Sequence, residues 1–246
     1  MVQLISRRGR LSVSQLSDEF AVTTETVRRD LSALDRMGLV RRVHGGAVPT
    51  GSFTVLESGI SERDQANTPA KESIAAAALA LLPPADSVIV IDAGSTTARL
   101  AAALPRDLRL TVITHAVPVA ARLADLPHIE LHLLPGKVRS ATHAAVGADT
   151  VAALGDVRVD VAFIATNGIS TGYGLTTPDR EEAATKRAII ECARRTIVLA
   201  DSTKIGLETA VRFAVLADID TLVTDGDIDA SDRRDLEKAG LEVVVA

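Results

Sequence analysis

The sequence is poor in aromatic side chains and in cysteine. Aromatic residues make up 2% of the 246 residues and tryptophan is absent, so a core has to be built from aliphatic side chains. The one cysteine, Cys192, excludes an intramolecular disulfide and a zinc site made of several cysteines. We therefore expect no metal ion and no cofactor in this chain.

Long apolar runs are missing as well. No stretch approaches the roughly 20 apolar residues of a transmembrane helix, and the early arginines are not followed by the apolar segment of a secretory signal. We therefore expect a cytoplasmic protein with no membrane partner. The hydrophobic content of 47% and charged content of 24% are ordinary for a globular chain, whose length allows a small domain and a medium one.

Lysine is scarce, with five in the chain and none among residues 1–48. Those 48 residues carry eight arginines and five acidic residues, a formal charge of +3, whereas the rest of the chain carries −8. A basic head on an acidic body indicates that the head meets a polyanion. We expect the head to span residues 1–48, a turn-rich linker to span 49–68, and the body to span 69–246.

A helix-turn-helix is predicted in the head. Ser12 is expected to cap one helix, with Gln15 completing a capping box, and Thr23 to cap a second helix that ends at Gly38. The second helix would enter the major groove, and a following β-wing would contact the DNA backbone. The candidate contacts are Thr23, Thr24, Thr26, Arg28 and Arg29 on the helix, and Arg41, Arg42 and His44 on the wing.

The body alternates apolar strands with helical segments, which predicts a parallel α/β sheet covered on both faces. The expected strands are 88–91, 110–114, 129–134, 159–165, 196–200, 221–225 and 241–245. The expected helices are 69–82, 98–104, 149–154, 178–193, 231–239 and one from 115 to 123.

The loop after strand 88–91 predicts an anion site. Asp92 ends the strand, Gly94 turns the chain, and the hydroxyl residues 95–97 precede a helix expected at Ala98. Free N–H groups at a helix start, at the carboxyl end of a strand, form a cradle for phosphate. Lys137 and Lys204 also follow strands, where a point charge can meet a phosphate. Lys186, four residues after Glu182, is either half of a surface ion pair or a site residue.

Several motifs resemble the DeoR family of bacterial transcriptional regulators. These are TVRRDL at 26–31, GLVRRVHGGA at 38–47, DAGSTT at 92–97, TPDREEAATKRAIIECA at 177–193 and LADSTKIG at 199–206. The resemblance covers nearly the whole chain. It implies a winged helix-turn-helix followed by an α/β sensor domain similar in fold to ribose-5-phosphate isomerase, in a repressor of sugar or nucleoside catabolism genes.

The resemblance also implies the effector site. The phosphate would be held by Asp92, Gly94, Ser95, Thr96 and Thr97. The sugar would be lined by Thr114, Gly136, Lys137, Gly168, Glu182, Lys186 and Lys204. At two positions on the expected rim, His115 and Pro135, the chain departs from the family's usual Asn and Gly, so we expect effector specificity to depend on them.

Three functions are compatible with these patterns. The first is a repressor of sugar catabolism or uptake genes that binds double-stranded operator DNA under control of a phosphorylated sugar. It would act as a homo-oligomer, a dimer or a tetramer, because one short helix contacts too few bases. The second is a sugar-phosphate isomerase with an accessory head, for which Glu181, Glu182 and Asp201 are possible general bases. The third is a constitutive DNA-binding protein whose pocket has no function. The helix-turn-helix favours the first and argues against an enzyme.

Overall fold

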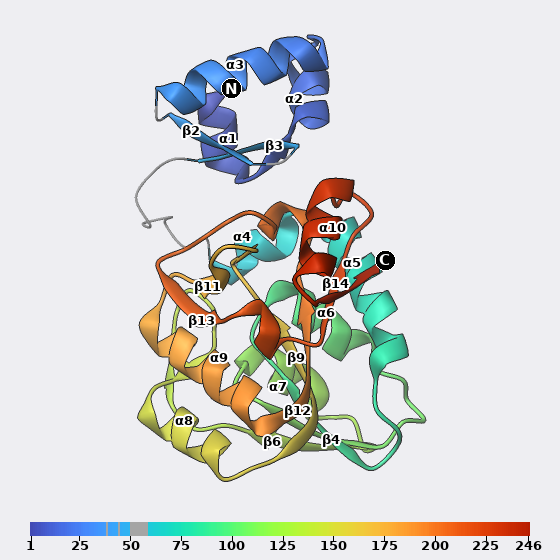
Figure 1. Cartoon of the computed structure of the whole chain (residues 1–246). Helices are drawn as coiled ribbons and strands as arrows, with labels where there is room; N and C mark the ends of the chain where they lie inside the picture. The colour runs from blue at the N-terminus through green and yellow to red at the C-terminus, as the bar shows by residue number, and fades with distance from the viewer. Residues whose placement is uncertain (38, 44, 50–58) are drawn as a thin grey trace.

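The structure, a computed structural model, describes residues 1–37, 39–43, 45–49 and 59–246, without the side chains of residues 6 and 7. Figure 1 shows a small head, drawn in blue, next to a larger α/β body. The predicted cap at Gly38, the predicted contact at His44 and the linker residues 50–58 lie outside the described residues. The domain boundaries at 48 and 68 therefore stay predictions.

The head holds three helices and a three-stranded sheet. Ser12 accepts from the backbone of Gln15 in the predicted capping box, and the Thr23 side chain accepts from the backbone N–H of Thr26. Val27 and Leu31 are fully buried in the head core. The helix-turn-helix and the wing are confirmed. The elements are α1 Val2–Arg8, α2 Val13–Phe20 and α3 Thr24–Arg36, with β1 Leu11–Ser12, β2 Val40–Val43 and β3 Gly46–Pro49 in the order β1-β3-β2.

Two helices join the head to the sheet. The first, α4 (Ile60–Gln65), lies inside the stretch predicted as a linker, and the second is α5 (Thr68–Ala78). Lys71 of α5 is buried and donates to the carbonyl oxygens of Arg63 and Ala66. These oxygens lie at the end of α4, so one ammonium group fixes the angle between the two helices.

A seven-stranded parallel sheet forms the centre of the body, as predicted. Its strands are β4 Ser87–Ile91, β5 Leu110–Thr114, β6 Ile129–Leu133, β9 Val159–Ala165, β12 Ala193–Leu199, β14 Thr221–Thr224 and β15 Glu242–Val245. The order is β15-β14-β12-β9-β4-β5-β6. From β4 the sheet continues on one side with β5 and β6, and from β9 it continues on the other side with β12, β14 and β15. The strand order therefore reverses between β4 and β9. The carboxyl ends at such a switch point form the crevice in which α/β sheets bind ligands.

Helices cover both faces of the sheet, which confirms the predicted layers. On one face, residues of α5, α6 (Ser95–Ala103) and α7 (Val117–Leu123) pack with Ile89, Ile91 and Phe163. On the other face, residues of α8 (Ala148–Gly155), α9 (Arg180–Cys192) and α10 (Ala230–Lys238) pack with Val90 and Ile164. Adjacent strand residues thus enter opposite cores, as the period of two requires. Three short 3-10 helices complete the body: Leu79–Leu81, Ser202–Lys204 and Leu216–Asp218.

Three helix starts were predicted wrongly, and one of these helices, expected from residue 178, begins at Arg180. The helix expected at Ala98 begins at Ser95, because Gly94 is already extended (φ 172°) and acts as the cap. The three hydroxyl residues therefore form the first helical turn and not a loop before it. The helix expected at His115 begins at Val117, with a proline in its first turn. His115 precedes the helix, and its carbonyl oxygen accepts from the backbone N–H of Ala145 at 2.7 Å.

The sequence did not predict the short antiparallel strands of the body. They are β10 Gly168–Ser170, β11 Gly174–Thr177 and β13 Val211–Ala214 in one small sheet, and β7 Lys137–Val138 with β8 Ala145–Val146 in another. Strands of two to four residues are too short for an alternation to be recognised. Both small sheets lie in segments that follow the carboxyl ends of the parallel strands.

Candidate functional site

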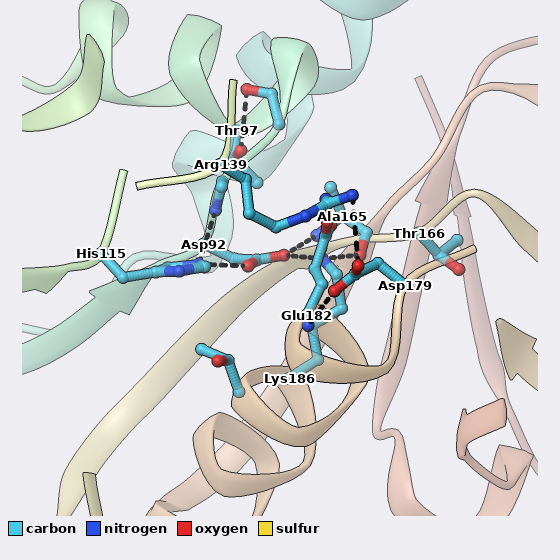
Figure 2. Close-up of polar contacts among 12 residues, drawn as sticks. Asp92, Thr97, His115, Arg139, Ala165, Thr166, Asp179, Glu182 and Lys186 are labelled. Atoms are coloured by element: carbon cyan, nitrogen blue, oxygen red, sulfur yellow. Dashed lines mark hydrogen bonds and ion pairs between the residues drawn. The ribbon is translucent and has the colours of Figure 1, made fainter. Parts of the chain in front are cut away.

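Asp92 is the centre of a buried polar cluster at the carboxyl end of β4. Its Oδ2 lies 2.5 Å from Lys186 Nζ and accepts from the backbone N–H of Ala165 at 2.8 Å, while its Oδ1 lies 2.8 Å from His115 Nε2. Lys186 also donates to the Ala165 carbonyl oxygen at 2.8 Å. Figure 2 shows these groups converging from β4, β9 and α9. Asp92, His115 and Lys186 are all at most 1% exposed.

The charge of Asp92 follows from its partners. Burial by itself would raise the pKa of the Asp92 carboxyl, but Lys186 and then His115 outweigh it and lower that pKa from 3.8 to about 2. Asp92 is therefore an anion with both oxygens already engaged. In the structure this carboxylate holds Lys186 and His115 beside the start of α6.

A second group of charges continues the cluster towards the surface. Arg139 pairs with Glu182 and lies 3.4 Å from Asp179, and Glu182 lies 3.8 Å from Lys186. Asp179 caps α9 by accepting from the backbone N–H of Glu182 at 2.9 Å. An unbroken chain of ion pairs therefore runs from Asp92 to Arg139. At this end of the series the side chain of Arg139 is 14% exposed and that of Asp179 is 29% exposed.

The predicted phosphate cradle lies directly beside this cluster. A Cβ atom at Gly94 would lie 2.6 Å from Ala165 Cβ and 3.0 Å from Thr97 Oγ1, so only glycine allows this approach of the backbone to β9. Ser95, Thr96 and Thr97 are buried in the first turn of α6, where N–H groups have no acceptor within the helix. The Thr97 hydroxyl donates to the Gly94 carbonyl oxygen at 3.1 Å and stiffens the turn.

The other predicted effector residues are distributed unevenly. Thr114 is buried and donates to the Ile91 carbonyl oxygen at 2.7 Å, which ties β5 to β4. Gly136 has φ 140°, and a Cβ there would lie 2.2 Å from Thr150 Oγ1. Lys137 pairs with Glu181 on the surface at 2.6 Å. Gly168 lies against the backbone of Leu207. Lys204 lines a cleft between the head and the body.

The structure thus brings together four of the predicted residues, Asp92, His115, Glu182 and Lys186, beside Gly94–Thr97. His115 was expected on the pocket rim, but it is fully buried and joins Asp92 to the Ala145 carbonyl oxygen at 2.8 Å. Of the other members of the cluster, Asp179 was not predicted as a site residue, and Arg139 was predicted only as the last residue of the strand-end loop 136–139. Asp179 carried a local signal as a helix cap, and Arg139 stands two residues after the predicted Lys137.

The candidate DNA contacts occupy the exposed face of α3 and the wing. Thr23, Thr24, Arg28 and Arg29 are exposed, and Thr26 is half-buried behind Thr23. Of the wing arginines, Arg42 donates to the Ser32 hydroxyl within the head at 2.8 Å. Arg41 instead faces the body, where it lies 3.6 Å from the Glu208 carboxylate.

In the described part of the chain, no three His, Cys, Asp or Glu side chains are grouped so that they could hold a metal ion. No helix among the described residues is long and apolar enough to cross a membrane.

Comparison with known proteins identifies both parts of the chain. Residues 1–52 match the DeoR-like helix-turn-helix domain, and residues 66–226 match the DeoR C terminal sensor domain. The HTH-type transcriptional regulator GlpR of Haloferax volcanii is 35% identical over 244 residues, covering 99% of this chain and 94% of the relative. The glycerol-3-phosphate regulon repressor of Escherichia coli is 30% identical over 226 residues, covering 92% of this chain and 88% of the relative.

A solved structure of ribose 5-phosphate isomerase A from Methanocaldococcus jannaschii is similar at 18% identity and a TM-score of 0.43. The similarity covers 57% of this chain and 55% of that one. The relatives with curated names are transcriptional regulators, and the matches to both DeoR domains agree with the motifs in the sequence. The chain therefore belongs to the DeoR family of transcriptional regulators, with a helix-turn-helix head and a C-terminal sensor domain.

Proposed function

We propose that this chain represses genes of sugar catabolism or uptake, and that a phosphorylated sugar bound beside Asp92 controls its hold on operator DNA. The observation that carries the proposal is the start of α6 at Gly94, placed against the buried Asp92–Lys186 pair. Backbone N–H groups at a helix start, with the positive end of the helix dipole, are suited to a phosphate dianion. The relative named as a glycerol-3-phosphate regulon repressor supports a small phosphate ester.

The series of ion pairs that ends at Arg139 supplies the rest of the proposed site. A phosphate at the start of α6 would sit beside Lys186, whose charge Asp92 already balances. The Arg139 side chain is 14% exposed, and its guanidinium can donate to sugar hydroxyls or to the ester oxygens. On binding, the cationic partners of Glu182 would exchange their ion pairs with this residue for pairs with the ligand. Because Glu182 belongs to α9, this exchange would tie ligand occupancy to the position of α9.

Exposure of the recognition helix supports the DNA part of the proposal. Thr24, Arg28 and Arg29 lie on the outward face of α3, where they can reach base edges and phosphates. Two heads are needed for an operator of useful length, so we propose a homo-oligomer, a dimer or a tetramer. Location in the cytoplasm follows from the role on DNA and is part of the same proposal.

An electrophoretic-shift assay tests the proposal. The full chain is mixed with DNA from upstream of its own gene, and a panel of phosphorylated sugars is added. At least one is expected to change the fraction of shifted DNA, and the unphosphorylated sugars are expected not to. If the DNA is shifted but no phosphorylated sugar changes it, the sensor assignment is wrong. Turnover of ribose 5-phosphate by the same preparation would favour the enzyme.

A further inference from the structure

Two arginines of the head contact the sensor domain. Arg10 Nη1 donates to the Ile205 carbonyl oxygen at 2.7 Å, and the same guanidinium pairs with Asp232 of α10. The Arg10 side chain is 7% exposed, so this pair is buried between the two parts of the chain. Arg41 of the wing donates to the Gly206 carbonyl oxygen at 3.4 Å and lies 3.6 Å from the Glu208 carboxylate.

The shape of the wing fits the same surface. Gly45, at the turn between β2 and β3, has φ 73°, and a Cβ atom there would lie 2.0 Å from Asp229 Oδ2. The wing turn is therefore pressed against the start of α10, and Figure 1 shows α10 on the side of the body that faces the head. We refer to Ile205, Gly206, Glu208, Asp229 and Asp232 as the docking surface.

The docking surface offers arginine the same kind of acceptor as DNA does. It presents three carboxylates and two carbonyl oxygens to a head of charge +3, and phosphate oxygens are likewise anionic acceptors for guanidinium groups. One guanidinium cannot pair with the Glu208 carboxylate and with a phosphate at the same time. We propose that the docking surface is an internal binding site for the wing that competes with DNA for Arg41. This inference rests on the proposed function, because it takes Arg41 to be a DNA contact.

The docking surface adjoins the turn that contains Lys204, a residue predicted to line the effector site. Ile205 and Gly206 directly follow the 3-10 helix Ser202–Lys204, whose Ser202 backbone N–H and hydroxyl both donate to Asp225 at the end of β14. Gly206 N–H donates to the Ile169 carbonyl oxygen of β10 at 2.7 Å. Movement of the turn would therefore displace the carbonyl groups that receive Arg10 and Arg41. By linkage, a ligand that strengthens docking weakens DNA binding, and bound DNA weakens the binding of that ligand by the same factor.

Glu208→Gln in the full chain tests the competition. Binding to a random-sequence duplex is measured by fluorescence anisotropy over a range of salt concentrations. Release of Arg41 is expected to tighten binding about 2- to 5-fold, the range of an exposed ion pair. One added phosphate contact is expected to steepen the slope of log K against log salt by about 0.9. The control is Glu237→Gln, which removes the same charge from an exposed residue of α10 that pairs with Arg233.

A second background separates competition from a general charge effect. In an Arg41→Gln chain, Glu208→Gln is expected to add no further affinity, because the group it releases is gone. Equal gains from Glu208→Gln and Glu237→Gln, or a gain that persists in Arg41→Gln, would overturn the proposal.

Docking itself is measured without DNA. Spin labels are placed at Ala21→Cys in the head and Ala239→Cys after α10, in a Cys192→Ala chain, since both alanines are exposed. A narrow distance distribution that broadens with Asp232→Asn is expected, and a broad distribution in the parent chain would refute docking. If the parent chain is docked but binds no duplex at any salt concentration, the proposed function fails. If DNA binding is intact but Glu208→Gln and Glu237→Gln have equal effects on it, only the competition is refuted.

Discussion

Lys186 Nζ lies 2.5 Å from Asp92 Oδ2, although the two residues are 94 positions apart in the chain. Both side chains are at most 1% exposed, so the pair is held out of water by the packing of α9 on β4 and β9. A buried pair of this kind is costly to break from one side, because the remaining charge keeps its desolvation penalty and loses its partner. Neither charge can therefore be removed alone without a loss of stability, and the pair holds Lys186 beside the proposed phosphate site.

Lys186→Met is expected to lower the free energy of unfolding by about 3–5 kcal/mol, because it leaves the Asp92 carboxylate buried and uncompensated. Urea unfolding at neutral pH measures the loss. The control is Lys238→Met, which removes an exposed pair with Asp235 and should cost at most about 1 kcal/mol. Adding Asp92→Asn to Lys186→Met should restore part of the stability. A loss no larger than that of the control would contradict the account of the pair.

Asp92 gives stability a specific pH dependence. Its pKa in the folded chain is about 2 instead of 3.8, so the folded state binds its proton less readily than the unfolded state does. The contribution is fully present above pH 3.8 and is lost as the pH falls towards 2, in total about 2 kcal/mol. Asp92→Asn should flatten this part of the profile of unfolding free energy against pH. Asp86→Asn, in an exposed pair with Arg109, should leave it unchanged, and identical profiles for both variants would refute the assignment.

Gly94→Ala is expected to weaken effector binding at least about 10-fold, because the new Cβ meets Ala165 Cβ and pushes the start of α6 away from β9. Isothermal titration calorimetry with the active phosphosugar measures the affinity. Gly155→Ala is the matched control, since no atom lies within 4 Å of a Cβ at the end of α8. If both variants bind the effector like the parent, the cradle is not at Gly94.

Arg28→Ala is expected to weaken operator binding about 10-fold or more, since an exposed arginine in the recognition helix contacts bases or phosphates. Its effector affinity should not change, because α3 is part of the head. Arg36→Ala, which removes the same charge from the last turn of the helix, should have a smaller effect on DNA binding. Parallel loss of DNA and effector binding in Arg28→Ala would indicate a folding defect and no specific contact.

Lys204→Ala is expected to blunt the effector's control of DNA binding while the affinity for free operator is retained. Lys204 lines a cleft beneath the head with Arg8 and Asn67, so two physical origins are possible and calorimetry separates them. A fall in effector affinity places Lys204 in contact with the ligand, whereas an unchanged affinity places it in the route to the head. An unchanged dose–response on operator DNA would remove it from both.

Much of the fold was predictable because it depends on residues close together in the chain. The caps at Ser12 and Thr23 act within three residues, and each parallel strand is a short apolar run bounded by turn residues. The start of α6 was predicted three residues too late, because hydroxyl residues suit both a loop and a first helical turn. The close approach of Gly94 to β9, which leaves no room for a Cβ atom, depends on the tertiary structure.

The candidate effector site was predicted only in part. Its glycine and hydroxyl residues form a local pattern, and Glu182 and Lys186 were suggested by resemblance to the family. Arg139 carried no comparable pattern, because its partners Asp179 and Glu182 lie about 40 positions further along the chain. Lys137 had the more suggestive position after a strand, yet it pairs with Glu181 on the surface.

The sequence by itself determined the two-part organisation, the helix-turn-helix and the alternation of strands and helices, because local propensity and periodicity specify them. Tertiary structure alone decided the strand order that brings Lys186 to Asp92 and the contact of Arg10 with Asp232. The physical reason is that an ion pair depends on distance in space. A sequence can supply a buried charge, but only the packed fold specifies which opposite charge compensates it.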